Sequence, residues 1–262
     1  MRCSVCLFVC ALMLLVPGRS ADAAARTVCS SGCQYTRLQD GIDDASPGDT
    51  IMLRAGQTFT ENVTLRNKNT SSTQYITIRS DAPDSSFPAS GVRLIPEGKP
   101  GANTSRSLLA RIVGKGGSYK SAPVIDTASG AHHYRLQFLE IDGLANVGYE
   151  TLVRFGSATA TSLSALPHSL VIDRVWLHSH PTLGMKRGVY LNSRSTDIVN
   201  SYFEDFFHFG DSQTILGTNG PGPYRIRNNH LEAAGENIMF GGEDPRITGL
   251  VPSDIEIYGN YV

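Results

Sequence analysis

The sequence predicts an all-β fold, a parallel β-helix solenoid, from three observations. An apolar-x-apolar run, closed by another apolar residue five positions later, occurs five times in the second half of the chain. A second ladder of short apolar runs falls between the copies of the first. β-Branched and aromatic residues alternate with polar ones in both ladders, which is typical of strands rather than helices. Two interleaved ladders with a common period indicate one repeating unit, carrying two strands, that stacks on itself.

The first ladder recurs with a spacing of 26 to 36 residues, and only Thr196 departs from its apolar rule. Its copies span residues 134–141, 170–177, 196–203, 224–231 and 255–262. The turn before the closing apolar residue is rich in asparagine, at Asn200, Asn228, Asn229 and Asn260. Asparagine tolerates left-handed backbone angles, so we expect it to turn the chain there and to bond the neighbouring coil.

The second ladder aligns on Phe155, Leu191, Leu216 and Phe240. This alignment places Arg154, Tyr190, Ile215 and Met239 in one outward column. The runs end at Gly156, Asn192, Gly217 and Gly241, where we expect positive φ angles. Leucine-rich and helical repeats are the competing solenoids, but neither the leucine consensus nor a 3.6-residue period is present.

The N-terminus predicts export. Arg2 is followed by an apolar run over 5–16 and by the small-residue stretch 21–25, the pattern of a secretory signal peptide. The run is too short for the roughly 20 residues of a membrane span. We therefore expect residues 1–25 to be a signal peptide, 26–262 to be a single β-helix domain truncated at its C-terminal end, and the protein to be secreted or periplasmic.

The composition of the chain limits the classes of molecule that it is expected to bind. The chain has 262 residues, 40% of them hydrophobic, and a net charge of −1 without a basic block, so nothing indicates nucleic-acid binding. Beyond the signal segment only Cys29 and Cys33 remain. In an exported protein they can form a small disulfide, and the alternative, metal binding, lacks two further ligands. The sequence does not indicate an oligomeric state.

The first third of the chain predicts a short helix and four strands. Thr36 and Gln39 have the spacing of a capping box, and the helix is expected over 36–46 as a lid on the first coil. Strand-like runs follow at 50–53, 61–65, 75–79 and 92–95. Residues 97–121 and 157–168 carry no ladder, and we interpret them as excursion loops that either wall a binding groove or have no role.

The segment Leu38–Gly56, with Phe59-x-Glu-Asn62 and Tyr75–Arg79, resembles the opening of secreted right-handed β-helix proteins of the pectin-lyase-like superfamily. The resemblance implies a right-handed coil with three parallel sheets. It does not fix a reaction, because the superfamily includes lyases, hydrolases and non-catalytic surface proteins. The run Val175–His178 is similar to the Trp-Ile-Asp-His motif of pectate lyases but lacks its aspartate.

Two sets of residues are candidates for an active site: the first would act as base or contact the substrate, and the second would bind a metal ion. Cleavage of a uronate polymer needs a group that neutralises the sugar carboxylate, a base, and often Ca²⁺ held by carboxylates. Lys186, Arg187 and Arg194 are the predicted base or carboxylate clamp, with solvated loop charges as the alternative. Substrate contacts are predicted at Trp176, Tyr190 and Asn192, although a packing role for Trp176 is also open.

Metal ligands are predicted at Glu232, Glu236, Glu243 and Asp244, with Ca²⁺ as the ion. Glu232 and Glu236, with Asn228 and Asn229, are similar to the Asn/Glu calcium arrangement of alginate-lyase and chondroitinase-like β-helix lyases. His178, His180, His208 and His230 follow strands, but the sequence does not place an H-x-H pair and a carboxylate on one face, so it does not predict a metal site there.

These observations lead to two hypotheses. The first is a secreted lyase that cleaves an acidic extracellular polysaccharide by β-elimination. The alternative is a non-catalytic carbohydrate-binding, adhesion or structural module, since no catalytic signature is complete.

Overall fold

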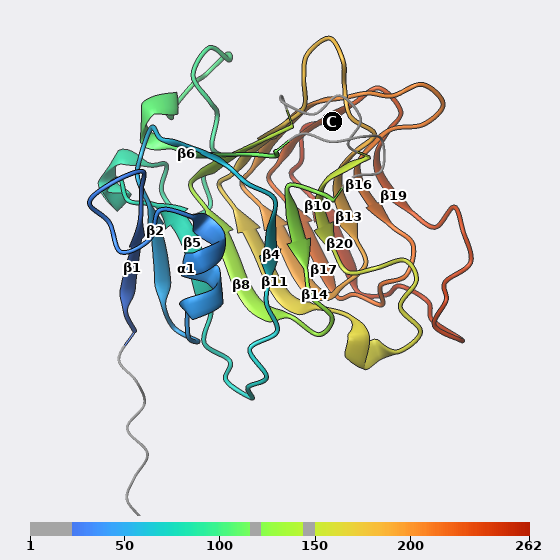
Figure 1. Cartoon of the computed structure of the whole chain (residues 1–262). Coiled ribbons are helices and arrows are strands. Elements are labelled where there is room, and N and C mark those ends of the chain that lie inside the picture. Colours follow the sequence, from blue (N-terminus) through green and yellow to red (C-terminus); the bar gives the residue numbers. More distant parts are fainter. Residues whose placement is uncertain (1–22, 116–121, 144–149) are drawn as a thin grey trace, which may run out of the picture.

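The computed structural model describes residues 23–115, 122–143 and 150–262, and most of the expected signal segment lies outside them. The described chain winds into a parallel β-helix with three parallel sheets (Figure 1), as the repeats and the resemblance predict. We name the sheets A, B and C. Within the described residues, sheet A has eight strands and sheets B and C have six each.

The strands of sheet A, in spatial order, are β1 (Ala25–Val28), β2 (Thr50–Leu53), β5 (Ile76–Ser80), β8 (His132–Gln137), β11 (His168–Asp173), β14 (Arg194–Val199), β17 (Tyr224–Arg227) and β20 (Ile255–Tyr258). Those of sheet B are β3 (Thr58–Thr60), β6 (Ala110–Val113), β9 (Leu139–Asp142), β12 (Trp176–His178), β15 (Tyr202–Phe206) and β18 (His230–Ala233). Those of sheet C are β4 (Val63–Leu65), β7 (Ile125–Thr127), β10 (Thr151–Phe155), β13 (Arg187–Leu191), β16 (Gln213–Gly217) and β19 (Glu236–Phe240).

The first ladder has the predicted register. Leu136 pairs with Ile172, which pairs with Ile198, and the column continues through Ile226 to Ile257. Its closing residues, such as Ile141 and Leu177, belong to separate strands in sheet B. The repeating unit therefore carries three strands, and the expectation of two was wrong.

One copy of the second ladder, residues 213–217, is displaced by one residue from the predicted register. Val189 pairs with Ile215 and Tyr190 with Leu216, so Ile215 is fully buried and Leu216 takes its outward place. The outward column is Arg154, Tyr190, Leu216 and Met239. Adjacent apolar residues at 215 and 216 gave the pattern no means of choosing the register.

The turn between sheets A and B is one residue in the left-handed region. Phe138, Arg174, Asn200 and Asn228 hold it with φ of 53° to 55°. Asn229 and Asn260 follow it, and each accepts a backbone N–H of the preceding coil at 2.9 Å through its side-chain oxygen. The expected role of the asparagines is confirmed.

Gly156 and Gly241 have the expected positive φ, whereas Gly217 and Asn192 do not. Gly217 is instead required by close approach, because a Cβ there would lie 2.8 Å from the Phe240 ring. Residues 92–95 form no strand, and the expected excursion 97–121 contains β6. Three short 3₁₀ turns, Asp84–Ser86, Arg106–Leu108 and Leu163–Ala165, lie in the loops.

The segment 81–109 covers the outer face of sheet B. Its Phe87, Leu94 and Leu109 form a second apolar cluster with Phe138, Trp176 and Tyr202, outside the core of the solenoid. No helix in the described part of the chain is long and apolar enough to cross a bilayer.

The predicted N-terminal helix is present as α1 (Leu38–Asp44), and it lies at the blue end of the solenoid in Figure 1. It buries Leu38 and Ile42 in the core, as a lid on the first coil. The capping box was wrong, since no side chain of the helix caps it. Glu61 does so from a distant part of the chain, accepting the N–H groups of Leu38 at 2.6 Å and Gln39 at 3.3 Å. The Cys29–Cys33 disulfide is formed just before the helix.

Replacing Glu61 by Ala is expected to lower the free energy of unfolding by about 1–2 kcal/mol, because two buried N–H groups lose their acceptor. Urea denaturation measures this loss, and Glu61→Gln, which keeps one acceptor oxygen, should lose less. Asp40→Ala on the exposed side of the same helix is the matched control. Equal losses for E61A and D40A would contradict the capping role.

Candidate functional site

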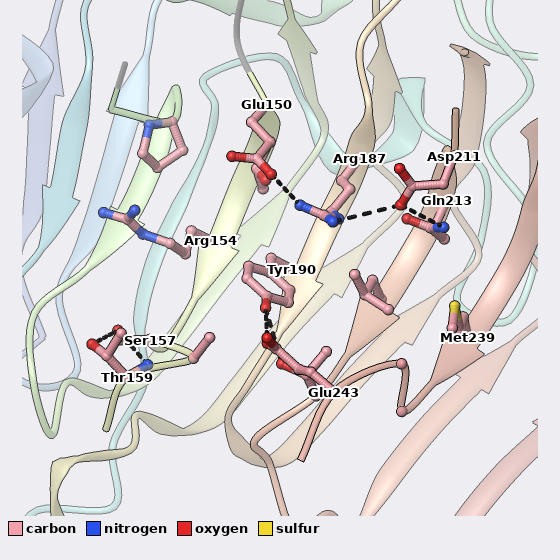
Figure 2. A pocket seen from close by; sticks show the side chains of 17 residues that line it. Glu150, Arg154, Ser157, Thr159, Arg187, Tyr190, Asp211, Gln213, Met239 and Glu243 are labelled. Atoms are coloured by element: carbon pink, nitrogen blue, oxygen red, sulfur yellow. Dashed lines mark hydrogen bonds and ion pairs between the residues drawn. The ribbon is translucent and has the colours of Figure 1, made fainter. Parts of the chain in front are cut away.

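A cavity of about 470 Å³ lies on the outer face of sheet C (Figure 2). Its wall is formed by outward residues of β10, β13, β16 and β19 and by the loops that follow β10 and β19. The charged and hydrogen-bonding side chains that line it include Glu150, Arg154, Arg187, Tyr190, Asp211, Gln213, Thr218 and Glu243. Leu216 and Met239 make one part of it apolar.

Arg187 is held between two carboxylates in this cavity. Its guanidinium lies 2.7 Å from Glu150 and 3.7 Å from Asp211. Figure 2 shows the side chain between these two carboxylates. Asp211 also pairs with Lys186 at 2.8 Å. The hydrogen bond from Lys186, supported by one from Gln213, holds the pKa of Asp211 below its usual range. Arg187 is thus fixed in position, with little of its side chain exposed.

Tyr190 lies at the centre of the cavity wall. Its hydroxyl donates to Glu243 Oε1 at 3.0 Å and lies 2.9 Å from Thr218 Oγ1. The Arg187 guanidinium sits over the Tyr190 ring, 5.2 Å from its centre. Burial raises the pKa of Tyr190, and the Glu243 carboxylate raises it further against the opposing bond from Thr218. The phenol is therefore a neutral proton donor at physiological pH.

Arg154 is the register partner of Tyr190 on the preceding coil. Its Nε donates to Asp126 at 2.9 Å, and this bond raises the pKa of Arg154. The side chain remains 41% exposed, so this guanidinium is the more accessible of the two in the cavity.

The structure brings some predicted site residues together and separates others. Arg187, Tyr190 and Glu243 line one cavity, and Lys186 borders it through Asp211. Arg194 begins β14 in sheet A, on a different face. Asn192 is fully buried, and its side-chain oxygen accepts the N–H groups of Thr218 and Asn219 at 2.8 Å, which commits it to a turn.

The predicted metal ligands are dispersed. Glu232 lies on β18 in sheet B, whereas Glu236 begins β19 in sheet C and accepts a bond from Gln213 at 2.8 Å. Glu243 is bonded to Tyr190, and Asp244 is exposed beside it. Their carboxylates form no group of three in the described part of the chain.

Another group of metal-binding residue types lies on sheet B. Ligand atoms of Glu140, Asp142 and His178 fall within 4.8 Å of one another, and all three residues are buried. Guanidinium groups already occupy these carboxylates: Arg106 Nε bonds Glu140 at 2.9 Å and Arg111 Nε bonds Asp142 at 2.8 Å. The donor set suits a metal ion. Because the guanidinium groups of Arg106 and Arg111 already neutralise the two carboxylates, we interpret the group as an ion-pair network.

His178 is part of that network. Its Nε2 lies 3.0 Å from Glu140 and 3.6 Å from Asp142. Burial opposes the charge on the imidazole, but these carboxylates overcome it and raise the pKa of His178. Burial likewise opposes the charge of Glu140, and the bonds from His178 and Arg106 lower its pKa. The raised pKa of His178 and the lowered pKa of Glu140 are both consequences of one buried ion pair.

Trp176 belongs to the same face rather than to the cavity of sheet C. Its indole N–H donates to Glu204 at 2.9 Å, its ring stacks on His178, and Arg106 lies over it at 5.3 Å. The side chain is buried by the segment 81–109. This placement favours a packing role for Trp176 over a substrate contact.

Sequence reasoning missed Glu150, Gln213 and Thr218 in the cavity and Glu140 and Asp142 on sheet B. A signal for the last two exists: Leu139-Glu-Ile-Asp142 alternates apolar and acidic residues, which predicts a strand with two carboxylates on its outer face. Glu150 and Gln213 carry no such signal, because they become neighbours only through the register of β10, β13 and β16.

No family model matches the chain, and no curated protein matches it. Among solved structures, the chain is similar to the alginate lyase from Paenibacillus sp. str. FPU-7, with a TM-score of 0.44 and 17% identity over 91% of this chain and 73% of that one. The fold assignment rests on the strand pairing described above, and the site rests on the geometry of this chain.

The raised pKa of His178 gives stability a definite pH dependence. A protonated imidazole stabilises the fold fully below its unfolded pKa of about 6.5, and this contribution is lost as pH rises through the folded value. His178→Gln should therefore cost about 2 kcal/mol at pH 6 and less at higher pH. Denaturant unfolding at several pH values measures it.

His180→Gln, two residues further along the chain, is the control and should leave the pH profile unchanged. A constant loss for H178Q between pH 6 and 9 would show that the imidazole is not charged in the folded protein.

Proposed function

We propose that the protein is a secreted member of the pectin-lyase-like superfamily that cleaves an acidic polysaccharide by β-elimination in the cavity of sheet C. The observation that carries the proposal is the Tyr190–Glu243 hydrogen bond, set in one cavity with Arg154 and Arg187. An acid, a base and two cations are the groups that this reaction needs.

The cations have the first role. The proton beside a uronate carboxylate becomes acidic only when the carboxylate charge is neutralised. Arg154 is exposed enough to receive that carboxylate. Arg187, which lies over the Tyr190 ring, adds positive potential to the cavity. Because Glu150 and Asp211 fix Arg187, it loses little side-chain entropy when the substrate binds.

The hydrogen-bonded pair of Tyr190 and Glu243, which we call the dyad, carries out the proton transfers. Glu243 takes the proton beside the carboxylate, and Tyr190 gives its hydroxyl proton to the departing glycosidic oxygen. The bond between sugar carbon and that oxygen breaks as a carbon–carbon double bond forms. Glu243 then returns the proton to Tyr190 through their hydrogen bond of 3.0 Å, which restores both groups.

Calcium, if bound, would be held by carboxylates beside the cavity and would supply positive charge for the uronate carboxylate. Glu243 and the adjacent Asp244 are the two predicted ligands that lie together, and carboxylate oxygens suit this ion. Assays with added Ca²⁺ and with a chelator separate a metal-dependent reaction from one that the arginines support alone.

One observation favours the alternative, a non-catalytic carbohydrate-binding module. Leu216 and Met239 make part of the cavity apolar, which fits the face of a sugar ring, and both arginines already have carboxylate partners. Binding without turnover is the outcome that would establish this alternative.

Tyr190→Phe and Glu243→Gln are each expected to lower kcat by about 10²–10⁴-fold on the substrate polymer, because each removes one proton-transfer group. Release of unsaturated uronates from alginate, pectate and glycosaminoglycans, followed by their ultraviolet absorbance, is the assay. Tyr75→Phe, just before β5, removes the hydroxyl of another partly buried tyrosine and is the matched control. Wild-type rates in Y190F would exclude this mechanism.

The pH profile supplies a further check on the dyad. With the pKa of Tyr190 raised, the phenol stays protonated, so the alkaline limb of the rate profile is expected above pH 10. Measuring kcat/KM from pH 6 to 11 tests this, since a fall near pH 8 would assign the acid to another group.

A further inference from the structure

The outer face of sheet A carries three histidines on two neighbouring coils. His132 and His133 begin β8, and His168 begins β11. His132 and His168 are direct register partners on adjacent parallel strands. None of the three takes part in the cavity of sheet C or in the network of sheet B.

The backbone brings the two consecutive histidines together. Successive residues of a regular strand point to opposite faces of the sheet. His133 has a φ of 56°, which breaks this alternation, and a hydrogen bond of 2.7 Å joins its Nδ1 to the Nδ1 of His132. The equivalent positions Ser169 and Ser195 have the same left-handed angle. The fold therefore offers this paired arrangement on several coils, and only the coil of β8 fills both places with imidazoles.

The third imidazole lies beside the pair. The His168 ring is parallel to the His132 ring, with centres 4.8 Å apart. His133 is edge-on to both, with ring centres at 4.9 Å from His132 and 5.6 Å from His168. His168 Nδ1 lies 3.1 Å from the Ser169 hydroxyl. The Nδ1 atoms of His132 and His133 are thus held together by their hydrogen bond, whereas the His168 Nδ1 is bonded to a hydroxyl and must turn away from it to reach an ion between the other two.

The hydrogen bonding is compatible with metal binding. A ligand nitrogen must offer a lone pair, and a bound ion would replace the one proton that the Nδ1 atoms of His132 and His133 share in their hydrogen bond. In contrast with the carboxylates of sheet B, no guanidinium is bonded to these imidazole nitrogens among the described residues.

We propose that His132, His133 and His168 form a transition-metal site that binds one Zn²⁺, Ni²⁺ or Cu²⁺ ion. Imidazole is the donor that these ions favour. His132 and His133 provide the preformed pair, and His168 turns toward the ion as the third ligand. The site is independent of the polysaccharide reaction.

The surroundings set the affinity. Arg194, the register partner of His168 on the next coil, opposes a bound cation. Tyr75 contacts His133 by its ring, and Arg135 lies over Tyr75. Asp197, two strand positions beyond Ser195 on β14, is paired with Arg225 and does not offset the charge of Arg194. Removing Arg194 should therefore strengthen the site.

Isothermal titration of the tag-free protein with NiCl₂ or ZnCl₂ alone tests the proposal. We expect one ion per chain. His132→Gln and His133→Asn should each weaken binding by about tenfold or more, and His168→Gln should weaken it less. Asparagine is chosen at 133 because it tolerates the left-handed backbone. Arg194→Ala should bind more tightly than the native chain.

His208→Gln, in the loop between β15 and β16, is the matched control and should bind like the native chain. Each variant is first shown to unfold at the native denaturant midpoint, so a lost site is not a lost fold. Unchanged affinity in the H132Q/H133N double variant, or no heat of binding in the native chain at millimolar metal, would overturn the proposal.

Discussion

In-register stacking of parallel coils is the constraint on which the rest of this structure depends. Every coil must leave sheet A and enter sheet B at the same place, and one left-handed residue makes that turn on each of four coils. The turns are also bonded to one another: Phe138 N–H donates to the Arg174 carbonyl, and Asn200 N–H donates to the Arg227 carbonyl, both at 3.0 Å. Outward side chains consequently form columns with a spacing of about 4.8 Å between coils. Any site on this fold is assembled from such columns, so a register shift of one residue changes the chemistry of a whole face.

That dependence explains how far the sequence could predict the fold. The register of sheet A from β8 to β20 was predicted correctly, because these strands, apart from Thr196 in β14, carry two apolar residues separated by one outward residue. In sheet C the apolar pair Ile215–Leu216 allowed two registers, and only packing between coils selects the one with Ile215 inside. Sheet B was not recognised, because its strands are three to five residues long and their outward positions mix charged with aromatic residues. Runs this short rarely show a clear period.

The site was predictable to a similar, limited extent. Arg187 and Tyr190 were found because they lie within a recognisable strand, and Glu243 because it follows one. Arg194 lies only three residues beyond Leu191, yet the turn at 192–193 carries it from sheet C to sheet A. Asn192 was a plausible ligand by type, but the turn uses its side chain to satisfy two backbone N–H groups. Glu61 shows the same limit at the helix, where the capping group comes from another coil. Contacts of this kind are set by the stack and not by local spacing.

The carboxylates on the outer faces of sheets B and C are paired with arginines in different ways, and this determines what each of the two faces can bind. On sheet B the carboxylates are buried beneath Arg106 and Arg111, so removing one partner leaves an uncompensated charge and the network holds the segment 81–109 in place. In the cavity of sheet C the paired carboxylates are more exposed, and in the proposed reaction a substrate carboxylate would exchange with Asp126 at Arg154 for little desolvation cost. With a net charge of −1, the protein has no long-range attraction for a polyanion. Selectivity in the proposed reaction would therefore come from the close geometry of Arg154, Tyr190 and Glu243, which favours groups that strengthen their contacts as charge develops.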